Sequence, residues 1–479
     1  MKLQKVLDIG ISLSKESDPD GLLGDILDGA MELTNCDAGS LYVLQDNKLY
    51  FRIMKTKSKG VNLVGEALRD FPPMSMKETN ICAYAAIHRR SLNIADAYES
   101  ELFDFSGPRK SDAQNQYRTK SMVAIPMIDH NGFVIGVMQL INALDEKGEI
   151  CSFSEEDEKI ISSLASQTAI CLSNMTYRQE LDRQIWSFTE ALTEVIDMRT
   201  PYNGSHTKNV AKYVGLIANY MNQLYEEGLE ETHFTKEHIS EMIMAAYLHD
   251  IGKVTTPLRV MNKKTRLEGH MEKIHARLEN RLLREEVEYY KGLSFGDNNK
   301  EELKASFEKN KHRIESALIL AEEADVAGFL SEELEKKIQD LQEFFTEEEL
   351  TCMRVKRGTL TEEERKIMEN HVEATGKILD KVYFNRSYAE APVWAAQHHE
   401  SLNGTGYPKG LKAEELSTEV RILSVADVCD ALLATDRPYK KPMPKDKAFA
   451  ILKSMADEGK LDLKYVKYLE KCLENDEKG

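Results

Sequence analysis

The stretch from Ser154 to Arg199 contains neither proline nor glycine, the residues that most readily interrupt a helix. Asp157 follows Ser154 at the spacing of a helix N-cap signature. The stretch therefore predicts one helix of roughly 45 residues, which is too long to bury its apolar side against a single small domain. Apolar residues recur along it at Ile160, Ile161, Leu164, Ile170, Cys171, Leu181, Ile185, Phe188, Leu192 and Val195.

This helix constrains the architecture, because an apolar stripe of such length needs a partner. We expect residues 154–200 to connect two domains and to pair with a second copy of the chain as a parallel homodimer. The alternative is a helix that breaks near Asn174-Met175 and packs back on its own domain.

Length and composition fit a multidomain chain. At about 150 residues per domain, 479 residues suggest two or three domains. The net charge of -18 argues against nucleic acid as a partner, because phosphate binding depends on lysine and arginine. No stretch approaches the roughly 20 apolar residues of a membrane span, and the N-terminus lacks a signal-peptide core, so we expect a cytoplasmic protein without membrane insertion. Seven cysteines without a Cys-x-x-Cys pair predict reduced thiols.

Residues 1–175 mix helix and strand signals. Apolar periodicity predicts a helix over 22–33 and strands over 40–44, 49–53, 121–127 and 134–141. A polar turn separates the first two strands, and Asn131-Gly132 is a strong turn signal between the last two. We therefore expect two β-hairpins beside a helix.

Several motifs of this segment match one known family: Gly39-Ser40-Leu41-Tyr42, Asn93-Ile94-Ala95-Asp96, Ile125-Pro126, Gly136-Val137-Met138-Gln139-Leu140 and Phe153-Ser154-Glu155-Glu156-Asp157. On these motifs residues 1–175 resemble a GAF domain, which implies a sensor with an α+β fold, an antiparallel sheet and flanking helices. Cyclic-nucleotide-binding GAF domains often carry Asn-Lys where this chain has Asn142-Ala143, so the GAF ligand is left unknown. The alternative is a GAF fold that dimerises and couples domains without a ligand.

After residue 200 the pattern becomes helical almost throughout. His206 opens an amphipathic helix, and a largely apolar helix over 239–249 ends in His249-Asp250. A carboxylate buried there would cost several kcal/mol unless an ion pair or a metal ion compensates it. Imidazole and carboxylate are ligands of divalent cations, so the pair is a candidate metal site.

Further histidines come from two later helices. His371 lies on one of them, and a helix over 392–399 delivers His398 and His399. Successive helix positions differ by about 100°. Both adjacent histidines can therefore reach one cluster only if the helix end points at it or if two metal ions are spread across it.

Carboxylates and glycines complete the pattern. Asp427 and Asp430 lie three residues apart in an apolar helix, where a ligand role is favoured over a solvated capping role. Gly404 and Gly406 lie in a turn shortly after the paired histidines. Because glycine has no Cβ, their backbone can approach a ligand closely.

These residues identify a second resemblance. His249-Asp250 with Lys253 matches one signature, and His398-His399-Glu400 with the turn from Asn403 to Pro408 matches another. On these signatures residues 201–479 resemble the HD-GYP phosphodiesterases, a branch of the HD metal-dependent phosphohydrolases, with an all-α HD-type helical bundle. The segment from Arg199 to Tyr202 is similar to the one that precedes the family's first histidine. The resemblance implies seven metal ligands: His206, His249, Asp250, His371, His398, His399 and Asp427.

The resemblance also implies an activity. Cyclic di-GMP would be hydrolysed to linear pGpG, with further cleavage to GMP left open, at two divalent ions bridged by Asp250. Without cysteine ligands, iron or manganese fits better than structural zinc, and a third ion is left open. The alternatives are a non-catalytic module that binds cyclic di-GMP and a hydrolase of another cyclic dinucleotide. Asp250 and Lys253 would be catalytic, and the substrate contacts would be Lys253, Gly404, Gly406, Tyr407 and Arg437.

The chain departs from the family pattern in two places. Asn403 replaces the more usual aspartate, and we expect little loss of metal and an altered affinity of the loop. Residues 258–357 expand a normally short connection into a charged insertion that we expect to be exposed, or else to act as a lid or as an arm for a protein partner. Its expected helices cover 272–292, 301–323 and 331–346.

Overall fold

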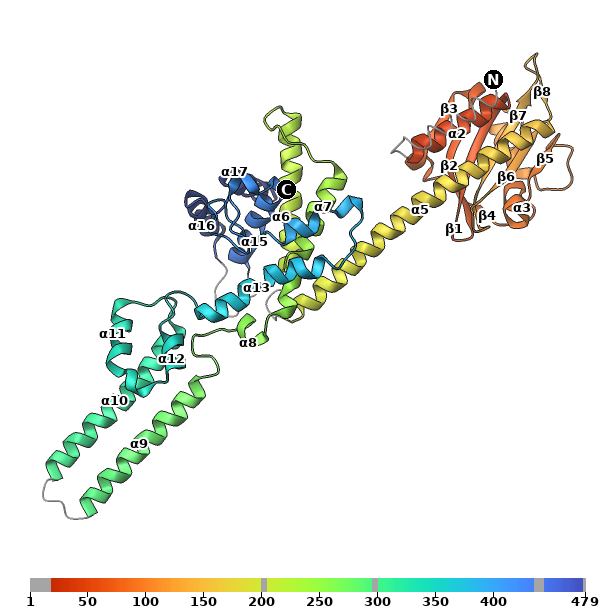
Figure 1. The fold of residues 1–479 in the computed structure, drawn as a ribbon. Helices are drawn as coiled ribbons and strands as arrows, with labels where there is room; N and C mark the ends of the chain where they lie inside the picture. Colours follow the sequence, from red (N-terminus) through yellow and green to blue (C-terminus); the bar gives the residue numbers. More distant parts are fainter. Residues whose placement is uncertain (1–18, 200–204, 295–299, 435–442, 477–479) are drawn as a thin grey trace. The chain divides into compact units, whose positions relative to one another are not determined.

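The computed structural model describes residues 19–199, 205–294, 300–434 and 443–476, and the chain divides into two compact units (Figure 1). The first unit runs from Met1 to Gln184 and the second from Ile185 to Gly479. Each unit contains hydrophobic core of its own.

The first unit is built on one antiparallel sheet with the strand order β3-β2-β1-β7-β6-β5, to which β4 and β8 add short pairings. Helices lie beside this sheet, which confirms the expected α+β fold. The helices are α2 (Pro19–Leu33), α3 (Ile81–His88) and α4 (Ser106–Asn115), and the strands are β1 (Cys36–Gln45), β2 (Lys48–Thr56), β3 (Val61–Val64), β4 (Met74–Ser75), β5 (Leu92–Ile94), β6 (Met122–Ile128), β7 (Val134–Leu144) and β8 (Ile150–Cys151).

Both expected hairpins are present, and turn chemistry explains them. β1 and β2 are joined by Asp46 and Asn47, whose φ angles of 47° and 58° suit a two-residue turn that follows the twist of the strands. Between β6 and β7, Asp129 Oδ1 accepts hydrogen bonds from the backbone N–H groups of Asn131 and Phe133 at 2.9 and 2.7 Å. The side chain thereby satisfies donors that the strand ladder leaves open.

Side chains alternate between the two faces of the sheet. On β6, Val123, Ile125 and Met127 join the core that includes α2, whereas Met122 and Ala124 join the core that includes α3. The sheet is therefore buried by helices on both faces, which explains why this strand is a nearly continuous apolar run.

The helix α5 runs without interruption from Glu155 to Asp197, so the alternative with a break near Asn174-Met175 is wrong. Its start is capped as expected, because the backbone N–H of Asp157 donates to Ser154 Oγ at 3.1 Å. The N-terminal half of α5 contributes to a core of the first unit, and its last turns pack on the main core of the second unit.

The second unit is helical in the parts that the structure describes, which confirms the expected bundle. Its main core joins the apolar faces of α6, α7, α15 and α17. The helices after α5 are α6 (His206–Glu226), α7 (Lys236–Leu248), α8 (Leu258–Met261), α9 (Met271–Ser294), α10 (Lys300–Val326), α11 (Glu332–Leu341), α12 (Glu347–Met353), α13 (Glu362–Leu379), α14 (Ala391–Ala395), α15 (Thr418–Leu433), α16 (Lys445–Asp457) and α17 (Leu463–Asp476).

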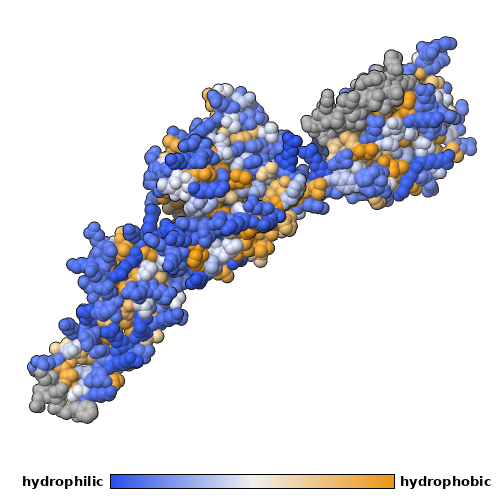
Figure 2. Space-filling view, in the orientation of Figure 1, coloured by the Kyte–Doolittle hydropathy of each residue, from blue (hydrophilic) through white to orange (hydrophobic). Residues whose placement is uncertain are grey.

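The insertion has a separate small core. Two of its expected helices are α9 and α10, which lie side by side (Figure 1) and show a mostly hydrophilic surface (Figure 2). The third expected helix, over 331–346, is present but shorter, because α11 ends at Leu341 and the next helix, α12, begins after Thr346. Thr346 and Glu349 form a capping box, which satisfies backbone donors at a new helix start and so favours the interruption.

Within the described ranges, no helix has both the length and the apolar character that crossing a bilayer requires. No disulfide links the cysteines of those ranges either.

Candidate metal centre

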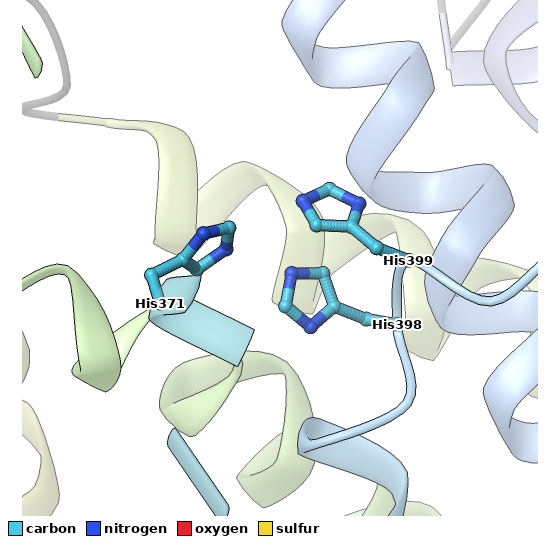
Figure 3. Close-up of side chains that lie close together, drawn as sticks. All are labelled: His371, His398 and His399. Atoms are coloured by element: carbon cyan, nitrogen blue, oxygen red, sulfur yellow. The ribbon is translucent and has the colours of Figure 1, made fainter. Parts of the chain in front are cut away.

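The seven candidate ligands come from separate elements of the second unit and lie close together. Three of them, carried by α13 and by the turn after α14, direct their rings toward one another (Figure 3). The seven are His206 at the start of α6, His249 and Asp250 directly after α7, His371 on α13, His398 and His399 after α14, and Asp427 on α15.

His398 and His399 lie on a turn. We expected a helix over 392–399, but α14 ends at Ala395, so that expectation is wrong. Ser424 Oγ, on α15, donates to the backbone oxygen of His398 at 2.7 Å and helps to hold the turn. Because the two histidines are not on a continuing helix, the separation of about 100° between successive helix positions does not apply to them.

The segment after α7 lies directly against α13. A Cβ on Gly252 would lie 1.9 Å from the backbone oxygen of His371, so glycine is required there. Thr375 Oγ1 accepts a hydrogen bond from the Gly252 N–H and donates one to the backbone oxygen of His249, each at 3.0 Å. These contacts hold His249 beside the helix that carries His371.

Asp250 lies between two groups of histidines. Its Oδ2 is 3.2 Å from His249 Nε2 and 3.6 Å from His206 Nε2. Its Oδ1 is 3.4 Å from His371 Nε2 and 4.0 Å from His398 Nε2. One oxygen faces each group, which is the arrangement of a carboxylate able to bridge two ions.

Asp427 repeats this division. Its Oδ1 lies 3.3 Å from His206 Nε2, and its Oδ2 lies 3.7 Å from His399 Nδ1. The ligand atoms of each group lie within 4.8 Å of one another, one group being His206, His249 and Asp250 and the other His371, His398 and His399.

Three buried histidines, His249, His371 and His398, share one hydrogen-bonding pattern. The Nδ1 of each bonds to the backbone oxygen three residues earlier, at 2.7, 2.6 and 2.7 Å. The Nε2 of each is buried and has no hydrogen-bond partner. A stranded buried polar atom costs about 1–3 kcal/mol, and a lone pair directed at a cation removes that cost. The donors therefore fit a divalent metal ion.

His206 is oriented by a side chain. Its Nδ1 lies 2.7 Å from Asp430 Oδ2, and Asn209 Nδ2 donates to Asp430 Oδ1 at 2.9 Å. A carboxylate behind a ligating imidazole fixes its tautomer and raises its basicity. The sequence pattern pointed to Asp430 beside Asp427, but Asp430 was not among the seven expected ligands, and here it orients a ligand instead.

Burial and charge set the protonation of the centre. Burial opposes ionisation of Asp250, but His249 and Lys253 outweigh it and hold the pKa of this carboxyl well below its usual value. Burial lowers the pKa of His399 to about 4 and that of His398 well below its ordinary value. Ionised carboxylates and neutral imidazoles are the forms that bind divalent metals.

Lys253 lies at the edge of this cluster. Its Nζ donates to Asp250 Oδ2, and its side chain is 20% exposed. Burial opposes the charged amine, but Asp250 outweighs it and raises the pKa of Lys253. A cation in this position can face a phosphate oxygen. Arg437, the other expected phosphate contact, lies outside the described residues.

The glycine-rich loop is held by the side chain of Glu400. Glu400 is buried and accepts hydrogen bonds from the N–H groups of Lys409 and Leu411 at 2.7 and 2.9 Å. A Cβ on Gly406 would lie 2.3 Å from the backbone nitrogen of Ser401, so this glycine permits the tight return of the loop. The structure thus gives Gly406 a role inside the loop itself.

The rest of the loop uses Gly404, Tyr407 and the unusual Asn403. Gly404 has a φ of 75°, which favours glycine, and the Tyr407 ring centroid lies 5.0 Å from that of His399. Asn403 Nδ2 donates to the backbone oxygen of Glu458 at 2.9 Å. An ionised aspartate cannot donate this bond, so the departure from the family pattern stabilises the loop.

Three segments of the chain match known family models. Residues 18–172 match the GAF domain model, residues 203–357 match an HD domain model, and residues 344–464 match a second HD domain model. Together the two HD matches include all seven candidate ligands.

The chain is also similar to curated proteins over part of its length. It is 43% identical over 97 residues to the 3'3'-cGAMP-specific phosphodiesterase 3 of Vibrio cholerae, which covers 20% of each chain. It is 42% identical over 98 residues to the cyclic di-GMP phosphodiesterase response regulator RpfG of Xanthomonas campestris, covering 20% of this chain and 25% of RpfG. It is 39% identical over 107 residues to a cyclic di-GMP phosphodiesterase of Thermotoga maritima, covering 22% of this chain and 28% of that one. The chain thus matches less than a third of the length of each relative.

Among solved structures, similarity is found to GAF-containing proteins. A GAF domain from an Acinetobacter phosphoenolpyruvate-protein phosphotransferase is 16% identical, with a TM-score of 0.30 over 38% of this chain and 98% of that chain. A GAF domain/HD domain protein from Geobacter sulfurreducens is 19% identical, with a TM-score of 0.26 over 34% of this chain and 98% of that chain.

Proposed function

The chain combines a GAF domain with an HD domain, and from that premise we propose that it is a metal-dependent phosphodiesterase that hydrolyses cyclic di-GMP to linear pGpG. The HD matches and the phosphodiesterase names of the similar proteins support the reaction class. The GAF domain would act as the sensor that regulates this activity.

One observation carries the proposal. Three buried imidazole Nε2 atoms without hydrogen-bond partners surround Asp250, whose two oxygens face separate groups of histidines. A purely structural cluster would pair such atoms with carbonyl or hydroxyl groups, because buried polar atoms are normally hydrogen-bonded. Imidazole lone pairs directed at ionised carboxylates instead suit a pair of divalent ions.

Each residue of the centre would have a distinct role. When bound, the divalent ions would activate a water molecule and polarise a phosphodiester oxygen. Asp250 would contribute one oxygen to each of the two ligand groups. Lys253 would neutralise charge that develops on the phosphate. Tyr407, half-buried beside His399, offers an aromatic surface for a guanine base.

We propose that the ions are iron or manganese and that two are bound. The two ligand groups contain imidazole nitrogen and carboxylate oxygen without thiolate, a set that suits these metals. A third ion would need a further donor near residue 202, which the structure does not describe.

The decisive experiment is a hydrolysis assay of the full chain purified with manganese or ferrous iron. Cyclic di-GMP is expected to give a linear product in the native protein and none in Asp250→Ala. Asp446→Ala, which removes an exposed carboxylate from α16, is the matched control and should retain full activity. A full rate in Asp250→Ala would eliminate this mechanism.

A hydrolase of another cyclic dinucleotide is the second candidate. It is favoured by the 43% identity to a protein named for 3'3'-cGAMP. Comparison of kcat/KM for cyclic di-GMP and 3'3'-cGAMP decides between the substrates. Binding of either without product, under every metal condition, would instead favour a non-catalytic signalling module, which the complete ligand set argues against.

The sensor role of the GAF domain needs its own test, because its ligand is unidentified. Mass spectrometry of the denatured full chain would detect a co-purifying small molecule. A mass that accompanies the protein and changes the hydrolysis rate when added back would support a ligand-binding sensor, and its absence would favour the coupling module.

We also propose a parallel homodimer formed through α5. Its apolar residues Ile170, Tyr177, Leu181, Phe188 and Val195 are between 41% and 62% exposed. They recur at intervals of seven and four residues, which is the spacing of a coiled-coil seam. Their exposure within one chain and their heptad spacing favour a second copy as the partner.

The seam is separate from the face that α5 buries in its own units. Leu164 and Ala165 are buried in the first unit and Thr193 is buried in the second, and none of these residues lies at a position of the heptad spacing of the seam. Leu181→Asp should therefore dissociate the dimer without unfolding either unit, and light scattering should report the mass of a monomer. Arg183→Asp adds the same carboxylate outside the seam and should leave the dimer intact.

We propose that the insertion binds a protein partner through exposed apolar side chains of α9. Leu283, Val287 and Tyr290 of α9 are between 50% and 63% exposed and lie on one helix face. Replacing all three with serine should leave hydrolysis unchanged if they serve an external partner. A loss of hydrolysis would show that this face contributes to catalysis instead.

A further inference from the structure

Arg199 follows the last turn of α5 and contacts the segment that contains the central carboxylate, residues 249–256, here called the HD segment. Its Nη1 donates to the backbone oxygens of Lys253, at 3.2 Å, and Val254. Its Nη2 donates to the backbone oxygen of Thr256 at 3.4 Å. One side chain therefore holds three carbonyl groups at the end of the HD segment.

The last turns of α5 run along α7, the helix that leads into the HD segment. Thr189 Oγ1 lies 3.4 Å from Met244 Sδ, and Thr193 Oγ1 donates to the backbone oxygen of Tyr247 at 3.2 Å. Arg199 extends this series of contacts to the HD segment itself. The last turns of α5 thus contact α7 and then the HD segment, which contains candidate metal ligands.

The HD segment is also fixed by α13, where Thr375 bonds to Gly252 and His249. Asp250 and Lys253 lie on the part of the chain that these two sets of contacts hold. A displacement of about 1 Å at reacting groups can slow catalysis by about 100-fold. Small changes in the HD segment are therefore sufficient to control the rate.

We propose that Arg199 is a positioning residue that fixes the position of the HD segment relative to the C-terminal end of α5. Through this contact, a change in the conformation of α5 would alter the positions of Asp250 and Lys253. The inference rests on the proposed function and adds a route for its regulation. Guanidinium suits the task, because its planar fork can serve several carbonyls at once, whereas the ammonium of lysine is a compact point charge.

The first test measures hydrogen exchange of the peptide covering the HD segment in the full chain without substrate. Arg199→Gln should accelerate exchange there about tenfold, while peptides of α15 remain unchanged. Lys447→Gln, which removes an exposed cation from α16, is the matched control. Unchanged exchange in Arg199→Gln overturns the proposal. If the native chain hydrolyses no cyclic dinucleotide, the proposed function fails while this test retains its meaning.

The second test separates positioning from general stability. Arg199→Lys and Arg199→Gln should lower kcat by roughly 10- to 100-fold, with KM and metal content changed by less than about twofold. A parallel loss of metal content and melting temperature would show a merely structural role and overturn the proposal.

The third test addresses transmission through α5. Leu181→Asp changes an exposed position of α5 in the first unit and should alter exchange of the HD segment in the native background. The same change should have no further effect when Arg199 is replaced by glutamine. Effects that simply add in the double variant, or no effect in the native background, overturn the transmission role.

Discussion

Thr375 should stabilise the candidate metal centre without being a ligand. Its buried hydroxyl accepts from the Gly252 N–H and donates to the His249 backbone oxygen, each at 3.0 Å. Thr375→Val keeps the shape of the side chain but leaves both backbone groups without a partner. Because each stranded buried group costs about 1–3 kcal/mol, the free energy of unfolding of the second unit should fall by about 3 kcal/mol.

The loss can be measured in the full chain without a signal from the first unit. The chain has two tryptophans, Trp186 and Trp394, and both lie in the second unit. Thermal unfolding followed by tryptophan fluorescence should give a melting temperature lower by roughly 6–12 °C, since each kcal/mol corresponds to about 2–4 °C for a large domain. The matched control is Thr351→Val on α12, an exposed threonine that bonds only to its own helix, at Glu347.

The control should shift the melting temperature by less than about 2 °C, as expected for a surface substitution. An equally small shift in Thr375→Val would refute the reasoning, because the hydroxyl bridge would then contribute no more than a surface threonine. A large shift accompanied by weaker metal binding would support it further, since the bridge presents His249 to the centre.

Three other predictions concern the centre directly. Removal of the metal with a chelator should lower the melting temperature of the second unit, because an ion at 100 times its Kd stabilises by about 2.7 kcal/mol; no shift would argue against a bound ion. Asp430→Asn should weaken metal binding about 10- to 100-fold in a titration, because it removes the charge behind His206; unchanged affinity would contradict that role. Gly406→Ala should lower kcat in the hydrolysis assay, because its Cβ would lie 2.3 Å from the Ser401 nitrogen and displace the loop; Gly107→Ala, where a Cβ meets no neighbour and φ is not positive, is the control for adding a methyl group at a glycine.

The candidate ligands could be predicted because their signatures are local. His249-Asp250 and His398-His399 are adjacent pairs that are visible in the sequence. The direction of their rings depends on packing against residues far away in the chain. No proline or glycine falls between Pro392 and Gly404, so the sequence alone does not mark where the helix ends. The chain instead leaves the helix after Ala395, and Ser424, on α15, bonds to the turn that follows.

The hairpins of the first unit were predictable for the same reason, since Asp46-Asn47 and Asn131-Gly132 are residue pairs that favour tight turns. The earlier end of α11 at Leu341 was missed because no proline or glycine follows it before Thr346. Contacts such as that of Arg199 with the HD segment join residues more than 50 positions apart, so only the folded structure reveals them.

The two ways of orienting the ligand histidines follow from where each lies on a helix. A histidine that follows a helical turn can bond through Nδ1 to the backbone oxygen three residues earlier, as His249, His371 and His398 do. His206 is the first residue of α6, and a side chain orients it instead, because its Nδ1 lies 2.7 Å from Asp430 Oδ2. Asp430 lies about one turn after Asp427 on the same helix. α15 therefore supplies both a candidate ligand and the group that orients another, which makes the geometry of one half of the centre depend on how this single helix is packed.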